Sequence, residues 1–323
     1  MCGCGFWGVG SGRLRHEFSH SLISDYIEKT LSAPGRDLYS IPTSKARFPD
    51  GAHYRTELLP TTAKEYERVF ELCDKHDFEG NKITDTRGAM FDTDEEIIRK
   101  VELCRERGAE LVMSPGSGEH QVDASHQMAV KALVEGKSRG MDMLVRNVAD
   151  MMRCLELGCR GFLVYDEGMM TIIAQLRRDG LIPKETTFKV SACISISNPL
   201  ALRFWIQKAE LGPNDSLNPI RDMTLPMLAA MRAITNQPLD VHAYWGTNLA
   251  RTLDTPEMVR VAAPVYFKVS LFGSGVTQED KFYQAMRVVE TIQRYYPEAK
   301  QSKNGAKGTV APAKPGVWKP KLG

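Results

Sequence analysis

The chain has 323 residues, of which 42% are hydrophobic and 25% are charged, and its formal net charge at pH 7 is +2. Such a composition is typical of a globular protein with a sizeable core. A net charge this close to zero gives no reason to expect a nucleic acid or a membrane surface as partner. Because no apolar run reaches the roughly 20 residues that span a bilayer, and the N-terminus has no signal-peptide pattern, we expect a cytoplasmic location.

The cysteines indicate the redox state of the chain. There are seven, an odd number. Most fall inside predicted helices or strands: Cys73, Cys104, Cys154, Cys159 and Cys193. This distribution indicates buried, reduced thiols and not a secreted disulfide framework. Cys2 and Cys4 are too close together in sequence to form a zinc-binding pair.

Composition distinguishes three regions along the chain. Residues 1–35 form an N-terminal extension that begins with a glycine-rich segment and contains a short predicted helix over residues 17–31. Residues 36–299 carry a periodic hydrophobic pattern. Residues 300–323 are rich in Lys, Gly, Pro and Ala without apolar periodicity, so we predict a flexible basic tail.

Short β-rich runs alternate with longer helical patterns through residues 36–299. The predicted strands are residues 55–59, 81–84, 110–114, 161–165, 188–194, 216–219, 239–244 and 265–270. The helical segments after them are residues 63–76, 94–107, 145–157, 169–179, 199–209, 225–234, 256–263 and 278–295. Eight strands alternating with helices predict a closed (β/α)8 TIM-like barrel. The absence of an early glycine-rich phosphate fingerprint disfavours the alternative, an open doubly wound sheet.

Several predicted strands carry charged side chains where buried parallel strands are usually runs of Val, Ile and Leu. Residues two apart share one face of a strand. In each of four pairs, the two side chains therefore point to the same face of their strand: Arg55 with Glu57, Lys189 with Ser191, Asp240 with His242, and Lys268 with Ser270. Their apolar neighbours must face the helices, which directs the charged members into the barrel. Because burying an unpaired charge costs several kcal/mol, these strands indicate either a compensating ion network or a ligand-binding cavity.

Further polar residues follow the predicted strands, at the barrel end where βα loops build active sites. Asp166 and Glu167 close the fourth strand, either as catalytic acids or as caps of the next helix. Asn218 ends the sixth strand on its inward face. These positions extend the predicted site from the strand faces to the barrel mouth.

Groups able to bind an anion are expected beside these acids. Arg139, in the long connection after the third strand, is expected either to clamp a carboxylate or phosphate through two hydrogen bonds or to pair with Asp142. Ser274 and Gly275 belong to a Gly-Ser-Gly loop before a helix, a place where backbone amides often hold an anion. The predicted substrate-binding set is Arg55, Lys189, Ser191, Asn218, Lys268, Arg139, Ser274 and Gly275.

The spacing Asp240-x-His242 places a carboxylate and an imidazole on one strand face. The pair is expected to act as a hydrogen-bonded general base or to belong to a metal site. Glu57 and Asp166, from other strands, would complete an oxygen-rich site for a divalent metal ion together with Asp240 and His242.

Lys189 and Lys268 are also candidates for covalent catalysis. A desolvated lysine flanked by another cation is suited to imine formation with a carbonyl substrate, as in a Schiff-base aldolase. Either lysine is otherwise expected to anchor a carboxylate electrostatically.

Several segments of the chain resemble a family of bacterial barrel proteins. They are FPDGAHYR at 48–55, RGMD at 139–142, DEG at 166–168, FKVS at 188–191, NP at 218–219 with LPMLAA at 225–230, LDVH at 239–242 and PEMVRVAAPVY at 256–266. Over roughly residues 48–270 the chain looks like the collagenase-like peptidases (peptidase family U thirty-two). The resemblance implies a TIM-like barrel in the bacterial cytoplasm. Better-understood members of that superfamily use a cysteine cluster, for an iron–sulfur centre or for RNA modification. No such cluster is recognisable in this sequence, so we do not expect an iron–sulfur cofactor.

The strand-face charges and strand-end acids together predict an enzyme that acts on a small anionic substrate, a carboxylate or an amide. The expected chemistry is acid–base hydrolysis or a lyase reaction in the barrel mouth, with or without a metal ion. In this hypothesis Asp240 and His242 are the base pair, and Glu57, Asp166 and Glu167 are acid partners or metal ligands. The alternatives are a non-catalytic binding or scaffold protein of a biosynthetic assembly, and a Schiff-base aldolase. Assembly into a homo-oligomer is left open.

Overall fold

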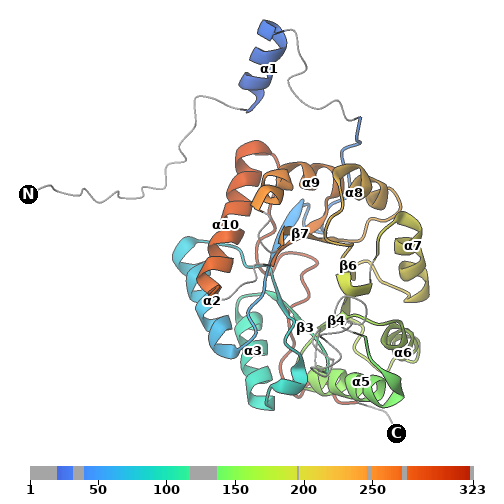
Figure 1. Ribbon diagram of the computed structural model, residues 1–323. Helices are drawn as coiled ribbons and strands as arrows, with labels where there is room; N and C mark the ends of the chain where they lie inside the picture. Colours follow the sequence, from blue (N-terminus) through green and yellow to red (C-terminus); the bar gives the residue numbers. More distant parts are fainter. Residues whose placement is uncertain are drawn as a thin grey trace, which may run out of the picture. The chain divides into compact units, whose positions relative to one another are not determined.

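Figure 1 shows the computed structural model, in which residues 20–31, 40–116, 137–194, 196–245, 249–270 and 275–320 are described. The chain divides into two compact units, residues 1–40 and residues 41–323. The first unit contains helix α1 (His20–Leu31), whose Leu22, Ile23 and Tyr26 side chains are exposed. All the other described elements belong to the second unit. Within the described ranges, no helix is long and apolar enough to cross a bilayer.

The second unit is a closed barrel of eight parallel strands, in which each strand pairs with the next and β8 pairs with β1. The strands are β1 (Tyr54–Leu58), β2 (Lys82–Asp85), β3 (Glu110–Met113), β4 (Gly161–Val164), β5 (Thr187–Val190), β6 (Ser216–Leu217), β7 (Leu239–Trp245) and β8 (Val265–Ser270). The helices around them in Figure 1 are α2 (Ala63–His76), α3 (Asp94–Glu106), α5 (Gly140–Glu156), α6 (Glu167–Arg178), α7 (Pro199–Lys208), α8 (Leu225–Arg232), α9 (Thr255–Ala262) and α10 (Gln278–Tyr295). The predicted (β/α)8 barrel is confirmed.

Local sequence signals explain where several of these helices begin. Helices α2, α3 and α10 start at capping boxes, in which a threonine side chain and the acid three residues later each accept a hydrogen bond from the other's backbone amide. The pairs are Thr62 with Glu65, Thr93 with Glu96, and Thr277 with Asp280. A cap of this kind stabilises a helix by about 1 kcal/mol. Helices α7, α8 and α9 carry proline in their first turn, where the missing N–H costs nothing.

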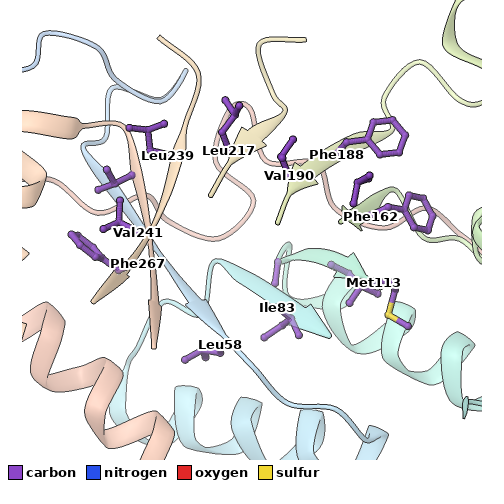
Figure 2. Packing of buried hydrophobic residues seen from close by; sticks show 14 of the residues in the cluster. Leu58, Ile83, Met113, Phe162, Phe188, Val190, Leu217, Leu239, Val241 and Phe267 are labelled. Carbon is purple, nitrogen blue, oxygen red and sulfur yellow. The ribbon is translucent and has the colours of Figure 1, made fainter. Parts of the chain in front are cut away.

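The alternation along the strands divides each one between two environments. Phe188, Val190, Val241 and Phe267 lie in the hydrophobic cluster between the strands and the surrounding helices, which Figure 2 shows from close by. The charged residues that alternate with them are at most 5% exposed although they belong to the other face. The apolar residues therefore pack outward, as predicted, and the barrel interior receives the charges.

Residues 300–320 correct the prediction of a loosely attached flexible tail. They belong to the barrel unit and run past the N-terminal ends of β1, β3 and β4. The amide of Ser302 donates to the carbonyl of Tyr54 at 3.1 Å, that of Gly305 to Gly108 at 2.9 Å, and that of Ala313 to Gly158 at 2.8 Å. Backbone hydrogen bonds hold this segment, and these need no apolar periodicity in the sequence.

Candidate active site

A chain of alternating charges occupies the barrel interior, from the N-terminal end of the strands to their middle. Its members, in order of contact, are Arg55, Glu110, Lys82, Asp240, Lys189 and Glu57. Each of these residues belongs to a strand of the barrel, and none is more than 8% exposed. A compensating ion network, which the sequence left open beside a ligand cavity, is therefore present.

Arg55 forms the lower end of this chain. Its Nη1 atom lies 2.5 Å from Glu110 Oε1, and its Nε atom donates to Ser302 Oγ at 2.9 Å. Tyr266 donates its hydroxyl to the same carboxylate, at 2.9 Å from Oε1. The guanidinium also lies over the Phe48 ring, 4.2 Å from its centroid. Arg55 was predicted to bind substrate, but in this structure its side chain binds other residues at the N-terminal end of the strands, which we call the barrel floor.

Lys189 holds two carboxyl groups at the centre of the barrel. Its Nζ atom lies 2.8 Å from Asp240 Oδ1 and is hydrogen-bonded to Glu57 Oε2. A second lysine, Lys82, lies 3.4 Å from Asp240 Oδ1 and 3.8 Å from Glu110 Oε2. The Lys82 ammonium also sits over the Tyr266 ring, 3.1 Å from its centroid. Lys82 therefore joins the lower layer of charges to the middle layer.

The surroundings of Glu57 and Asp240 separate their proton affinities. Burial raises the pKa of Glu57, the charge of Lys189 opposes this rise, and the neighbouring Asp240 carboxylate adds to it. Burial acts in the same direction on Asp240, but Lys189, Lys82 and a hydrogen bond from Glu57 together bring the pKa of Asp240 well below its ordinary value. Glu57 is thus the more readily protonated of the two carboxyls and Asp240 the more readily ionised, the difference that general acid–base catalysis uses.

The upper part of the barrel interior contains polar groups that the ion chain does not engage. Lys268 is 5% exposed and makes no hydrogen bond or ion pair with any residue that the structure describes. Thr84 Oγ1 and Ser114 Oγ, which alternate with outward residues on β2 and after β3, are buried without a hydrogen-bond partner. The same holds for Glu57 Oε1 and Asp240 Oδ2. Buried polar atoms are normally satisfied, so this group of atoms indicates room for water or a polar ligand.

His242 lies in this upper part but is not hydrogen-bonded to Asp240 as the sequence suggested. Its Nδ1 atom is 3.2 Å from Ser270 Oγ on the neighbouring strand, and both residues are buried. His242 is in register with Lys268, which is in register with Glu57. The imidazole therefore belongs to the same layer as the unengaged lysine.

The acids predicted at the end of β4 lie outside the barrel interior or serve the next helix. Asp166 is the N-cap of α6, accepting from the Met169 amide at 2.7 Å, and it also accepts from the Ser138 amide at 2.9 Å. Glu167 pairs with Lys137 at 2.5 Å, and its side chain is 59% exposed. The structure thus does not bring either acid to Asp240, and it shows the helix-cap role that was the alternative for Asp166.

The remaining predicted residues are dispersed. Asn218 is buried, and when its side-chain amide oxygen and nitrogen exchange places, the nitrogen donates to the carbonyl oxygens of Asp240 and Pro219, both at 3.0 Å. Ser191 is buried, with its hydroxyl accepting from the Cys193 amide at 3.2 Å. Arg139 is exposed at the start of α5. Gly275 has a positive φ of 82° before α10, and Ser274 lies outside the described residues.

The predicted metal ligands do not form a coordination set. Lys189 occupies the position between Glu57 and Asp240, and Asp166 is engaged as a helix cap. Within the described ranges, no group of three or more His, Cys, Asp or Glu side chains is arranged to hold a metal ion. The donor set proposed from the sequence therefore does not fit a divalent cation.

Sequence reasoning missed Lys82 and Glu110, although a signal was present. Lys82 and Thr84 alternate with Ile83 in the same way as the pairs that were recognised, and Glu110 begins the third strand. A second buried cluster gave no signal at all. Lys100 on α3 lies 2.8 Å from Asp85 and 2.6 Å from Asp92, outside the barrel interior. Because that cluster is satisfied by its own members, we attribute a structural role to it.

No family model and no curated protein matches this chain, so the resemblance to the collagenase-like peptidases stays a prediction. Among solved structures the chain is similar to a mutant of the O-GlcNAc hydrolase of Thermobaculum terrenum, with 12% identity and a TM-score of 0.50. That match covers 76% of this chain and 61% of the hydrolase, so this chain spans less than two thirds of the length of the hydrolase. Identity this low shows a shared fold and nothing about activity.

Two further matches are weaker. A homocysteine methyltransferase from Escherichia coli has 13% identity and a TM-score of 0.45, covering 70% of this chain and 82% of its own. A carboxyl transferase domain of pyruvate carboxylase from Rhizobium etli has 14% identity and a TM-score of 0.40, covering 76% of this chain and 48% of its own. These likenesses carry no further argument about this protein.

Proposed function

We propose that this chain is an enzyme that binds a small anionic substrate in the upper half of the barrel and acts on it by acid–base chemistry. The observation that carries the proposal is Lys268, a buried cation without a hydrogen-bonded or ion-paired partner among the described residues. The described charges of the barrel interior support it. Four cations (Arg55, Lys82, Lys189 and Lys268) stand against three carboxyls (Glu57, Glu110 and Asp240).

This imbalance has a physical consequence. The first three cations are each in contact with a carboxylate, so the excess charge falls on Lys268. A protonated Glu57 would enlarge the excess. Because an unpaired buried charge costs several kcal/mol, an anionic group placed at Lys268 would relieve the imbalance. A carboxylate fits this requirement, and the hydroxyl groups of Thr84 and Ser114 add hydrogen-bonding capacity around it.

The catalytic groups in this proposal are Glu57 and Asp240. A carboxyl that keeps its proton can donate it to a leaving or developing oxyanion, and an ionised neighbour can accept a proton from substrate. Their free oxygens, Oε1 and Oδ2, are the atoms available for this exchange. His242, which is in register with Lys268 on the neighbouring strand, is the third group able to transfer a proton. Hydrolysis and lyase chemistry both follow from this set.

A Schiff-base reaction is the second candidate, and the difference between the two lysines favours Lys268 for it. The Nζ atom of Lys189 is shared between two carboxyls, whose contacts occupy it and keep it from a carbonyl substrate. Lys268 has no such partner, and its amine is therefore the one able to attack a carbonyl carbon. The chemistry would be imine formation with loss of water.

Binding of small carboxylates tests the proposal. The wild type and the Lys268→Met variant would be titrated with pyruvate, malate, aspartate and asparagine, with the melting temperature as readout, because a ligand that binds the folded state raises it. Lys208→Met, which removes an exposed lysine on α7, is the matched control. We expect stabilisation by at least one of these compounds in the wild type and the control, and its loss in Lys268→Met.

Two results would change the assignment. If no small anion stabilises the wild type, the self-paired interior favours the non-catalytic binding or scaffold role. Borohydride reduction in the presence of pyruvate separates the two enzymatic candidates. A covalent adduct on the peptide that contains Lys268 indicates imine chemistry, and an unmodified peptide leaves acid–base catalysis.

A further inference from the structure

A cavity lies at the opposite end of the barrel from Lys268, beside the beginnings of β1 and β6–β8. Its volume is about 230 Å³. Its wall is formed by two aromatic side chains and four prolines: Phe48, Pro49, Pro213, Pro238, Pro264 and Tyr266. The Phe48 and Tyr266 rings meet edge to face, with centroids 5.1 Å apart. Such rigid, flat apolar surfaces are suited to the faces of a planar ring.

The polar groups at this cavity are cationic or neutral. Arg47 and Arg55 border it, together with the amides of Asn214 and Asn236. Arg55 is already committed to Glu110 and Ser302. Arg47 donates only from Nη1, to the carbonyls of Ser44 at 2.9 Å and Ala46 at 2.6 Å. Its Nε and Nη2 atoms have no hydrogen bond among the described residues, and it forms no ion pair there.

The neighbouring His53 has a pKa lowered from 6.5 to about 4 by burial, Arg47 and Lys300. Because only Nη1 of Arg47 donates to a described residue, the guanidinium offers its other planar edge. Such an edge is the geometry that binds a carboxylate through two hydrogen bonds.

We propose that this floor cavity is a binding site for a small molecule made of one ring and one carboxylate. The ring would lie between Phe48, Tyr266 and the prolines, and the carboxylate would pair with Arg47 and accept from Asn214 or Asn236. A cavity of about 230 Å³ is large enough to hold a single ring with one carboxylate. The proposal does not depend on the function assigned to Lys268, since the two sites share no residue.

One residue of the C-terminal segment, Gly308, borders this cavity with a φ of +87°. A Cβ atom there would lie 2.4 Å from Pro49 Cγ. Only glycine allows the backbone to pass this close to the proline in that conformation. Gly308 therefore contributes to the wall together with residues of the barrel.

Titration calorimetry of the full chain with sodium benzoate tests this site. We expect saturable binding to the wild type and at least a tenfold weaker affinity in Arg47→Gln, the loss typical of a charge-assisted contact. Lys45→Gln removes an exposed cation two residues away that does not border the cavity, and it should bind benzoate as the wild type does. Absence of saturable binding to the wild type, or equal losses in both variants, overturns the proposal.

Three further measurements locate the binding and define its chemistry. Arg47→Lys keeps the positive charge but lacks the planar guanidinium that makes two hydrogen bonds. We therefore expect it to bind benzoate more tightly than Arg47→Gln but less tightly than the wild type. Neutral benzamide should bind the wild type at least tenfold more weakly than benzoate, and equal affinity overturns the carboxylate requirement. Lys268→Met should retain benzoate binding. If it loses that binding, benzoate occupies the barrel mouth and the floor site is wrong.

Discussion

Lys189 Nζ lies 2.8 Å from Asp240 Oδ1, at a point in the barrel where both side chains are at most 1% exposed. The same Nζ atom is hydrogen-bonded to Glu57, so one ammonium group neutralises a pair of carboxyls. The interaction therefore couples three strands, β1, β5 and β7, through a single side chain.

Replacing Lys189 by methionine should destabilise the protein by about 3–5 kcal/mol, because it leaves buried carboxylates without their cation. Denaturant unfolding measures this loss as a lower midpoint. The double variant Lys189→Met with Glu57→Gln should recover part of the loss, since the removed cation then leaves one ionisable carboxyl fewer. If the single variant is as stable as the wild type, the pairing seen here contributes nothing to folding.

The tail should loosen from the barrel floor in acid, through His53. Its Nδ1 atom accepts a hydrogen bond from the Lys300 amide at 3.1 Å, which a protonated ring cannot do. The pKa of His53 is lowered from 6.5 to about 4, first by burial and then by Arg47 and Lys300. The unfolded chain therefore binds more protons between these values, so this contribution is complete above pH 6.5 and is lost as the pH falls towards 4. The protection factors of the amides in residues 300–305, which correct exchange rates for their intrinsic pH dependence, should fall over that interval in the wild type. In His53→Gln this fall should be absent, and an identical profile in both proteins would contradict the assignment to His53.

Alanine substitution at two glycines of the tail distinguishes the free-energy cost of a steric clash from the cost of an unfavourable backbone conformation. Gly308 and Gly316 have φ values of +87° and +75°, so alanine at either should cost about 1–2 kcal/mol. At Gly316 a Cβ atom meets nothing within 4 Å, whereas at Gly308 it meets the rigid ring of Pro49 at 2.4 Å. We expect Gly308→Ala to lose about 1–3 kcal/mol more than Gly316→Ala, as overpacking does. Equal midpoints of denaturant unfolding would show that the tail moves away from Pro49 at no cost.

The barrel and the inward charges could be predicted because both follow from local geometry. Strand residues alternate between two faces whatever the rest of the chain does, so Lys189, Asp240 and Lys268 could be placed in the interior from their apolar neighbours alone. Capping boxes such as Thr62 with Glu65 likewise mark helix starts within four residues of sequence.

The pairing of those charges could not be predicted, because it depends on the register between strands. Glu57 is level with Lys82 on one side and with Lys268 on the other, and its contact is with Lys189 across the barrel. Nothing in the order of the sequence selects among three lysines. The same limit applies to Asp240 and His242, which share a face but find their partners on other strands. The tail was missed for a related reason, since its hydrogen bonds join it to segments as distant as Gly108 and Gly158.

Substitution of Lys268 by methionine should raise the stability of the folded protein, whereas the same substitution of Lys189 should lower it. Both are buried lysines of the barrel interior, but Lys268 makes no ion pair or hydrogen bond with the described residues. Its desolvation is therefore not offset by a contact, and Lys268→Met should stabilise the ligand-free protein by about 1–3 kcal/mol. Such a gain at the expense of binding is expected of a residue that is kept for function. Lys268→Arg, which keeps the charge, should bring no gain. The check is the denaturant midpoint of each variant without added ligand, and a loss of stability in Lys268→Met comparable to that of Lys189→Met would mean that the cation is already paired within the folded chain.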